Sequence, residues 1–316
     1  MTTQIAKTPG YLAILICACF GAASNAYGQA NRDADLDARI TRQTTNVDND
    51  RHSENYGFEV IVTAPILYTN FAVQTISDEL ISRQGDWHFA PDVLLKWTHQ
   101  FDWVKLTVGA DVFADRYLKQ TLASEDALVG TVKAAFTDGR SDLFVPYLSY
   151  TGAMDFQPWL AKRDDTLHDF AAGFSSAIGF DGSGAVIPYK KANMTGDAYL
   201  RFDARIGQRL ADPTDFENRF AVATLQIGYF LNREIEVSIS PQLKARWYDN
   251  YFGDVRRDFN AGALLFVAWT PDWLRKMVHG AEIDFTANLE RNFSNLPEKT
   301  YTRWEAGPSV VFRARF

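Results

Sequence analysis

Apolar and polar side chains alternate one by one along most of this chain, from Tyr56 to Phe316. The stretch 281–290 is a clear case, because every odd position is apolar and every even position is polar. Alternation with period two is typical of a β-strand whose two faces meet different surroundings. The pattern predicts an all-β domain over 56–316 with about twelve strands of roughly 10–16 residues each. The predicted strands are 56–71, 86–101, 102–118, 125–137, 141–156, 166–180, 195–211, 217–232, 234–249, 257–273, 277–293 and 302–316.

The connections between these strands mostly alternate between short and long. Short ones such as HQFDW, TDGRS, LNRE and TPDWLRK follow even-numbered strands, and longer ones such as AVQTISDELISRQG follow odd-numbered strands. Membrane barrels of bacteria have short periplasmic turns and longer outer loops, and an even strand number puts both termini on the periplasmic side. One connection breaks this rule, because DGSGAVIPYKKANMTG is long where a short turn is expected.

Alternation alone fits two folds: a soluble sandwich or lipocalin-like barrel with an apolar inside, and a transmembrane barrel with an apolar outside. The tryptophans favour the membrane barrel, because all of them lie toward strand ends, where the lipid–water boundary would be. A soluble core would bury some of them at strand centres. On the predicted strands, Trp87, Trp159, Trp247 and Trp304 fall at outer ends, and Trp97, Trp103, Trp269 and Trp273 fall near periplasmic ends.

The N-terminal segment has the features of a secretory signal. Lys7 precedes the apolar run YLAILICACFGAA, and small residues follow with cleavage expected after Ala26 or Gly28. A lipoprotein anchored at Cys19 is the alternative. We therefore assign 1–28 to a signal peptide and 29–55 to a flexible, polar periplasmic leader. Both cysteines lie in the signal, so no disulfide is expected in the mature chain.

Composition narrows the function. The formal charge is -7, which argues against nucleic acid as a partner, since phosphate binding needs a basic surface.

The signal segment, the two-faced strands and the final strand WEAGPSVVFRARF together resemble the general class of Gram-negative outer-membrane β-barrel proteins. The resemblance implies an antiparallel up-and-down barrel in the bacterial outer membrane. It also implies that Phe316, with Phe312 on the same face, forms the assembly signal recognised by the barrel-assembly machinery.

Candidate chemistry is sparse. None of the five histidines has a metal-ligand spacing, so we expect neither a metal nor another cofactor. A lipid hydrolase would need a nucleophile and a base on neighbouring strands, and the nearest candidates are His168 with Asp169 and Ser175 or Ser176. The motif G-x-S-x-G is missing from the sequence. We therefore expect a protein without enzymatic activity.

Strand parity identifies the side chains that would line the lumen. An acidic wall is expected on the strands that meet when the barrel closes, and a basic wall opposite, which includes Arg209. Lys96, Lys105 and Arg303 are exceptions on the acidic side, and Asp203 and Glu236 are exceptions on the basic side. The predicted acidic positions are Glu59, Asp92, Asp111, Asp115, Glu282, Asp284, Glu290 and Glu305, and the predicted basic positions are Arg201, Arg205, Lys244 and Arg246. The predicted aromatic girdle consists of Trp87, Trp97, Trp103, Trp247, Trp269 and Trp304.

Charged walls select solutes by sign, and they also pair across a narrow lumen and close it. The sequence thus predicts a narrow channel for diffusion of small polar or charged solutes. The alternatives are a structural, assembly or partner-binding barrel with a closed lumen, and a lipid hydrolase. The expected partners are outer-membrane lipid, the assembly machinery and small solutes.

Overall fold

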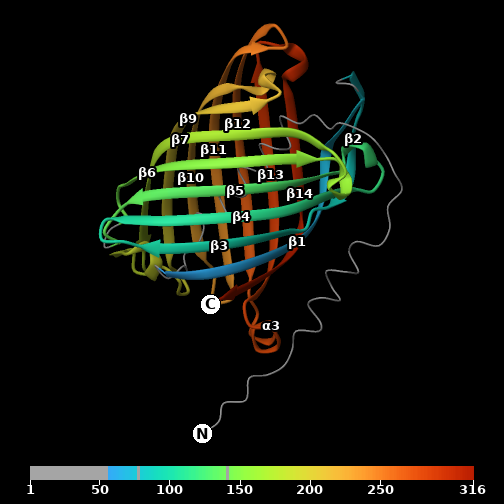
Figure 1. Cartoon of the computed structure of the whole chain (residues 1–316). Coiled ribbons are helices and arrows are strands. Elements are labelled where there is room, and N and C mark those ends of the chain that lie inside the picture. Colours follow the sequence, from blue (N-terminus) through green and yellow to red (C-terminus); the bar gives the residue numbers. More distant parts are fainter. Residues whose placement is uncertain (1–55, 77–78, 140–141) are drawn as a thin grey trace.

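The computed structural model describes residues 56–76, 79–139 and 142–316, which form a closed antiparallel barrel (Figure 1). Closure is made by β14 on β1, in a register that runs from Glu59 opposite Arg315 to Thr69 opposite Glu305. The strands β2 and β3 both pair with β1 and together make one wall strand, while the two-residue β8 lies off the path. The wall therefore has twelve strands, which confirms the predicted architecture. The predicted signal peptide and leader lie outside the described residues.

The wall strands in chain order are β1 (Tyr56–Ile76), β2 (Glu79–Phe89), β3 (Asp92–Gln100), β4 (Val104–Tyr117), β5 (Glu125–Phe136), β6 (Val145–Phe156), β7 (Arg163–Phe180), β9 (Ala198–Asp212), β10 (Asn218–Phe230), β11 (Ile235–Tyr251), β12 (Asp254–Trp269), β13 (Ala281–Ser294) and β14 (Tyr301–Arg315). We call the end of the barrel that holds Tyr56 and Phe316 the inner end, and the opposite end the outer end.

The break between β2 and β3 falls at Ala90 and Pro91. Proline has no backbone N–H for the ladder, so a strand seldom runs through it. Hydrogen bonds from the Ala90 amide to the Pro65 carbonyl (3.2 Å) and from the Ala114 amide to the Pro91 carbonyl (3.0 Å) keep the chain joined to both neighbours. The wall therefore continues through the break.

Two predicted connections have more structure than the sequence indicated. The region 72–85 was expected to be a long loop, and most of it extends β1 and β2 as a paired hairpin beyond the outer end. The expected tight turn 270–276 is largely taken up by the helix α3 (Asp272–Met277), which ends one residue beyond it. Pro271 precedes this helix and its carbonyl accepts the Arg275 amide (3.0 Å). Asp272 lies in the first turn and Arg275 and Lys276 lie in the last, which suits the helix dipole. Trp273 consequently lies in α3 and not in a strand.

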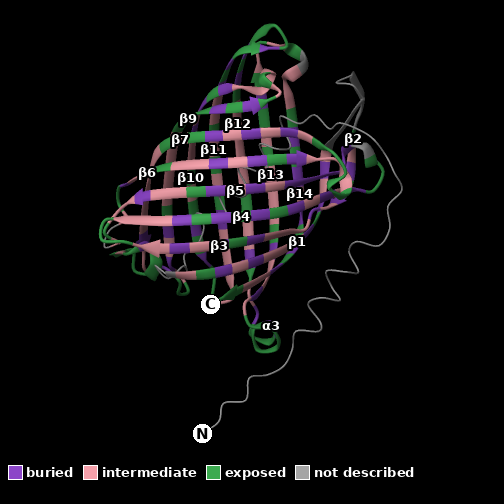
Figure 2. Cartoon of the chain, in the orientation of Figure 1, coloured by how far each residue is buried: buried purple, intermediate pink, exposed green. Residues whose placement is uncertain are grey.

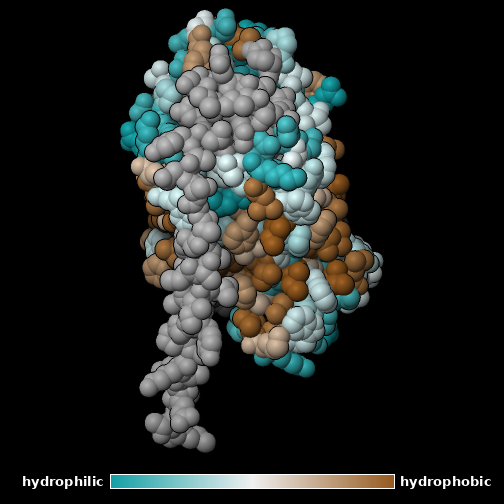
Figure 3. All heavy atoms as spheres, turned by 90° about the vertical axis from the view of Figure 1, so that its right-hand side faces the viewer, coloured by the Kyte–Doolittle hydropathy of each residue, from teal (hydrophilic) through white to brown (hydrophobic). Residues whose placement is uncertain are grey.

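The two faces of the wall differ as the alternation predicts (Figure 2). In β4, for example, Asp111 and Phe113 are buried inside the barrel, whereas Val112 between them and Val108, which precedes both, are exposed on the outside. Exposed apolar side chains gather in a band around the middle of the molecule, with a hydrophilic outer end above it (Figure 3). Within the described ranges, no helix is long and apolar enough to cross a bilayer.

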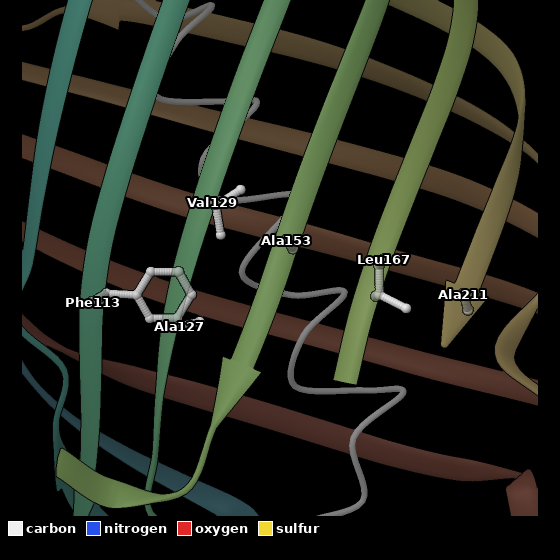
Figure 4. Close-up of a cluster of buried hydrophobic side chains, with 6 residues drawn as sticks. All are labelled: Phe113, Ala127, Val129, Ala153, Leu167 and Ala211. Carbon is white, nitrogen blue, oxygen red and sulfur yellow. The ribbon is translucent and has the colours of Figure 1, made fainter. Parts of the chain in front are cut away.

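The inside of the barrel is not polar throughout. An apolar cluster lies on the inner face of β4 to β9, toward the outer end (Figure 4). Phe216, from the outer connection between β9 and β10, packs against it. Its members are Phe113, Ala127, Val129, Ala153, Leu167 and Ala211.

Candidate functional site

The unexpectedly long connection after β7 folds back against the inner mouth of the barrel. We call residues 181–197 the inward segment. Its side chains Tyr189 and Ala192 are buried against Tyr199 and Phe230 of the wall. The rings of Tyr189 and Tyr199 meet edge to face, with their centroids 5.4 Å apart. This apolar contact fixes the segment to the β9 and β10 side of the mouth and explains its length.

Small residues on β7 make room for the inward segment. A Cβ atom added to Gly179 would approach Ala192, Ile187 and Pro188 to within 3.0–3.1 Å. The pairs Gly179 with Ile187 and Phe180 with Val186 join β7 to β8 (Val186–Ile187) within the segment. The glycine therefore allows the backbones to pair closely where a larger residue would separate them.

The turn that starts the segment is tied by Asp181. Its carboxylate accepts hydrogen bonds from the Ser183 hydroxyl (2.6 Å) and from the Ser183 and Ala185 amides (2.9 Å each). These bonds, that of the Ser183 side chain first, lower the pKa of Asp181 below its ordinary value. The carboxylate is thus ionised at neutral pH and holds the turn.

Between the inward segment and the opposite wall lies a cavity of about 130 Å³. Its lining comes from β3 to β7, from β9 and from the short 3₁₀ turn Tyr189–Lys191 of the inward segment. Hydroxyl and amide groups such as those of Thr107 and Ser175 contribute to it. Its cationic lining side chains are Lys96, Lys105, Lys133, Lys190 and Arg201, and its lining carboxylate is that of Asp142.

Strand register brings two of these lysines together and places a third on the same face. Lys105 is opposite Ala135 and Lys133 is opposite Thr107, so the two lysines are diagonal neighbours on one face, with Cα atoms about 7–8 Å apart. Lys96 on β3 is opposite Gly109, on the same face.

Tyr147 positions Lys133. A Cβ atom on Gly173 of the adjacent strand would come within 2.8 Å of the Tyr147 ring and hydroxyl, so only glycine leaves room for the ring to lie across that strand. The Tyr147 hydroxyl donates to both carboxylate oxygens of Asp203, at 3.0 and 2.9 Å. The Lys133 ammonium lies 3.9 Å from the centre of the same ring, a cation–π contact.

The outer half of the lumen is held by buried ion pairs. His88 contacts Asp115 (2.6 Å) and Glu305 (3.1 Å), and Arg303 contacts Glu305 (3.0 Å). Farther around the wall, Arg209 binds Asp169 through two hydrogen bonds of 2.7 Å. Arg256 likewise pairs with Asp258, and its guanidinium lies over the rings of Tyr248 and Tyr251. Buried charges need such partners, and these pairs fill space in the lumen.

The predicted lumen residues all lie on the inward-pointing side of their strands, and their role toward solutes stays a prediction. Glu59, Asp111, Asp115, Arg246, Asp284 and Glu305 are buried, and Asp92, Arg201, Asp203, Arg205, Lys244, Glu282 and Glu290 are half-buried. In the inner half, Lys96 and Lys105, the predicted exceptions, line one cavity together with Arg201. Sequence reasoning missed two lining lysines. The position of Lys133 in the alternating pattern of its strand could have placed it on the inward face. The position of Lys190 depends on the fold of the inward segment, which the pattern does not predict.

The predicted girdle tryptophans lie on the outside. Trp87, Trp103, Trp247, Trp269 and Trp304 are exposed and Trp97 is half-buried. Toward the outer end, the Tyr68 ring packs between Trp87 and Trp304, at centroid distances of 5.4 and 5.3 Å. At the inner end, Phe58 packs against Trp97 at 6.5 Å. Phe312 is half-buried and Phe316 is exposed.

The candidate hydrolase residues do not assemble into one site. His168 accepts or donates a hydrogen bond at 2.8 Å with the Tyr150 hydroxyl, whereas Asp169 points to the other face and binds Arg209. Ser175 lines the inner cavity and stands seven positions farther along the strand from His168, on the opposite face. Among the residues that the structure describes, no group of three or more His, Cys, Asp or Glu is placed to hold a metal ion.

The height of the apolar band matches a membrane. From Phe58 in the inner aromatic row to Tyr68 in the outer row, β1 rises about 33 Å at 3.3 Å per residue. A strand tilt of roughly 40° reduces this to about 25 Å, the height of the apolar band in outer-membrane barrels. A closed barrel with such a band needs lipid around it. The protein is an outer-membrane β-barrel of the Gram-negative type, located in the bacterial outer membrane and surrounded by its lipid.

Comparison with solved structures gives neighbours of the same class at low identity. The translocator domain of the autotransporter NalP from Neisseria meningitidis is 9% identical, with a TM-score of 0.44, over 90% of this chain and 98% of that one. The KdgM porin in complex with disordered oligogalacturonate is 10% identical, with a TM-score of 0.37, over 79% and 97%. Outer membrane phospholipase A from Escherichia coli is 12% identical, with a TM-score of 0.41, over 78% and 89%. No protein-family model and no curated protein sequence matches the chain.

Proposed function

We propose that the barrel is a narrow channel for diffusion of small polar or charged solutes across the outer membrane, without enzymatic activity. The observation that carries the proposal is the cavity of about 130 Å³ in the inner half of the lumen. Ammonium, guanidinium, hydroxyl and amide groups line it. Such a lining is wetted by water and replaces part of the hydration shell of a passing solute.

A closed barrel that serves structure or partner binding is the second candidate. The specific observation in its favour is the set of buried pairs in the outer half, such as His88 with Asp115 and Arg256 with Asp258. On the channel proposal, these pairs narrow the path and exclude large solutes. On the closed-lumen proposal, they seal it.

Liposome swelling separates the two candidates. Vesicles that contain the purified full-length protein are diluted into an isotonic solution of a small polar solute, such as glycine or arabinose. The channel proposal predicts solute entry and swelling, at rates that fall as the solute becomes larger. Vesicles that swell no faster than protein-free vesicles with any of these solutes contradict the channel and favour the closed barrel.

A further inference from the structure

Three arginines lie on the lipid-facing side of the wall near its outer end. Arg219 of β10 and Arg257 of β12 are both in direct register with Trp247 of β11, one on each side of it. Their Cα atoms are therefore about 10 Å apart, because neighbouring strands are about 4.8 Å apart. Arg291 of β13 is on the same face, and the side chains of all three arginines are exposed. We call Arg219, Arg257 and Arg291 the arginine patch.

Trp247 places the patch at the boundary between lipid and water. Its ring is exposed at the outer end of β11, and amphipathic rings collect at that boundary. Toward the middle of the barrel the same face is apolar, with Leu243, Phe259 and Leu289 exposed. The patch therefore lies at the level where lipid headgroups meet the acyl chains.

Local contacts bring Arg291 toward Arg257. The guanidinium carbon of Arg291 lies 4.9 Å from the centre of the Phe293 ring, and Phe293 is nearer the outer end of the strand. Asn295 fixes the backbone at Arg257, because its side-chain oxygen accepts the Arg257 amide (2.6 Å) and its own amide donates to the Arg257 carbonyl (3.2 Å). Arg257 and Phe293 are then diagonal neighbours, with Cα atoms about 7–8 Å apart.

The patch keeps hydrogen-bond donors available to a ligand. In the described part of the chain, Arg257 and Arg291 form no ion pair, although the exposed Asp254 lies in the turn before Arg257. Arg219 binds the exposed Asp249 through its Nη2 atom alone, at 2.9 and 3.1 Å, which leaves its Nε and Nη1 groups. A guanidinium that faces lipid needs an anionic partner. Here that partner has to come largely from outside the protein.

The outward-facing Arg116 of β4 is a contrasting case. It binds the Asp126 carboxylate of β5 and the backbone carbonyls of Asp115 (2.9 Å) and Glu125 (2.8 Å). Its guanidinium also lies 4.8 Å from the centre of the Trp159 ring. The charge of Arg116 is thus neutralised within the protein. The described contacts of the patch arginines are far fewer, so a purely structural role does not account for them.

From this arrangement we propose that the arginine patch binds the phosphate groups of anionic lipids in the outer leaflet of the outer membrane. Guanidinium groups bind phosphate oxygens through paired, charge-assisted hydrogen bonds. The exposed apolar side chains below the patch contact the acyl chains of the same lipid. Because the arginines come from three strands, a headgroup with two phosphates engages more of them than a headgroup with one. The proposal uses the membrane location alone and does not depend on the channel.

The test compares two triple variants that lose the same charge. The patch variant changes the three outer arginines, and the matched control changes three exposed cations at the inner end. Arg257→Gln alone is a second test variant, because this exposed side chain can be changed without disturbing the wall. Folded full-length protein in detergent is titrated by native mass spectrometry with lipid A that carries two phosphates or one. The triple variants are Arg219→Gln/Arg257→Gln/Arg291→Gln and Arg233→Gln/Arg275→Gln/Lys276→Gln.

We expect the wild type and the control to bind the two-phosphate lipid A, and the patch variant to bind it about tenfold more weakly or worse. Arg257→Gln should show an intermediate loss, and it decides the test alone if the patch variant does not fold. In the wild type, affinity should fall when one phosphate is removed, and this dependence should disappear in the patch variant.

Three results overturn the inference. They are equal binding by the wild type and the variants of the patch, an equal loss in the control, and wild-type affinity that ignores the number of phosphates. None of these results bears on the channel, which conductance measurements judge separately.

Discussion

At the scale of single residues, buried aromatic rings in this barrel rest on glycines of the neighbouring strand. Tyr147 crosses Gly173 to reach Asp203, and Tyr199 crosses Gly228 to donate to Glu236 at 2.8 Å. Phe220 likewise occupies the space above Gly207. The missing Cβ lets a ring lie flat on the inner wall. Two of these rings, those of Tyr147 and Tyr199, thereby hold the carboxylates of Asp203 and Glu236 in place.

Buried pairs should contribute far more to stability than exposed ones. Replacing Arg209 by Ala leaves Asp169 without its guanidinium in a site where both side chains are largely shielded from water, and should cost about 3 kcal/mol or more of unfolding free energy. Arg219→Ala breaks the exposed pair with Asp249 and should cost less than about 1 kcal/mol. Urea unfolding of both variants in detergent micelles measures the difference, and equal losses would contradict a shielded lumen.

The sequence predicts the inward or outward direction of each side chain but not its partner. Alternation placed Glu59, Arg209 and Glu305 on the inner face because direction depends only on parity within one strand. Which inward groups meet depends on the stagger between strands, and periodicity does not contain that information. The grouping of Lys96 with Lys133 and Arg201 was therefore visible only in the structure.

At the scale of elements, the sequence predicted the strands well and the connections poorly. Strand boundaries follow turn residues and alternation, which are local signals. The inward segment owes its position to distant contacts, above all Tyr189 on Tyr199. α3 was missed because six residues are too few to show a helical period. The hairpin of β1 and β2 continues past the aromatic row, where backbone pairing persists beyond the apolar band.

The closing strand offers a test of the predicted assembly signal. Phe316 and Phe58 exchange backbone hydrogen bonds of 2.9 and 3.3 Å, and both rings are exposed at the inner end. If the Phe316 ring is the feature that the assembly machinery recognises, Phe316→Ala should lower the amount of folded barrel in the outer membrane, while Phe58→Ala should leave it close to normal. Heat-modifiable mobility of membrane fractions measures the folded amount. An equal loss of folded barrel in both variants would indicate that Phe316 is an interfacial anchor and not the feature that the assembly machinery recognises.

At the scale of the whole molecule, the barrel combines a lipid-facing band with a lumen divided along its axis. Its inner half holds a basic cavity and its outer half holds buried ion pairs. The sequence suggested walls of opposite charge facing one another across the lumen. In the inner part, lysines from β3, β4 and β5 line one cavity with the arginine of β9, and two of these lysines are the predicted exceptions.

The position of the membrane band is testable with two equally exposed residues. Leu243 lies at the middle of β11 with 51% of its surface exposed, and Val255 lies at the outer end of β12 with 52% exposed. In lipid vesicles, Leu243→Arg should destabilise the folded barrel by about 2–4 kcal/mol, and Val255→Arg by about 0–1 kcal/mol, because the cost of arginine depends on depth. Equilibrium folding into vesicles gives both values. Equal small costs would indicate that water, and not lipid, surrounds the middle of the barrel.

The central claim is that a path for small solutes runs through the lumen, and single-channel recording in planar bilayers tests it most directly. Purified full-length protein should produce discrete conductance steps, and the same preparation after thermal unfolding should produce none. Because the inner cavity is narrow, the steps should be small and should shrink when large organic ions replace potassium and chloride. Bilayers that stay silent while parallel assays show folded, inserted barrel would contradict the account.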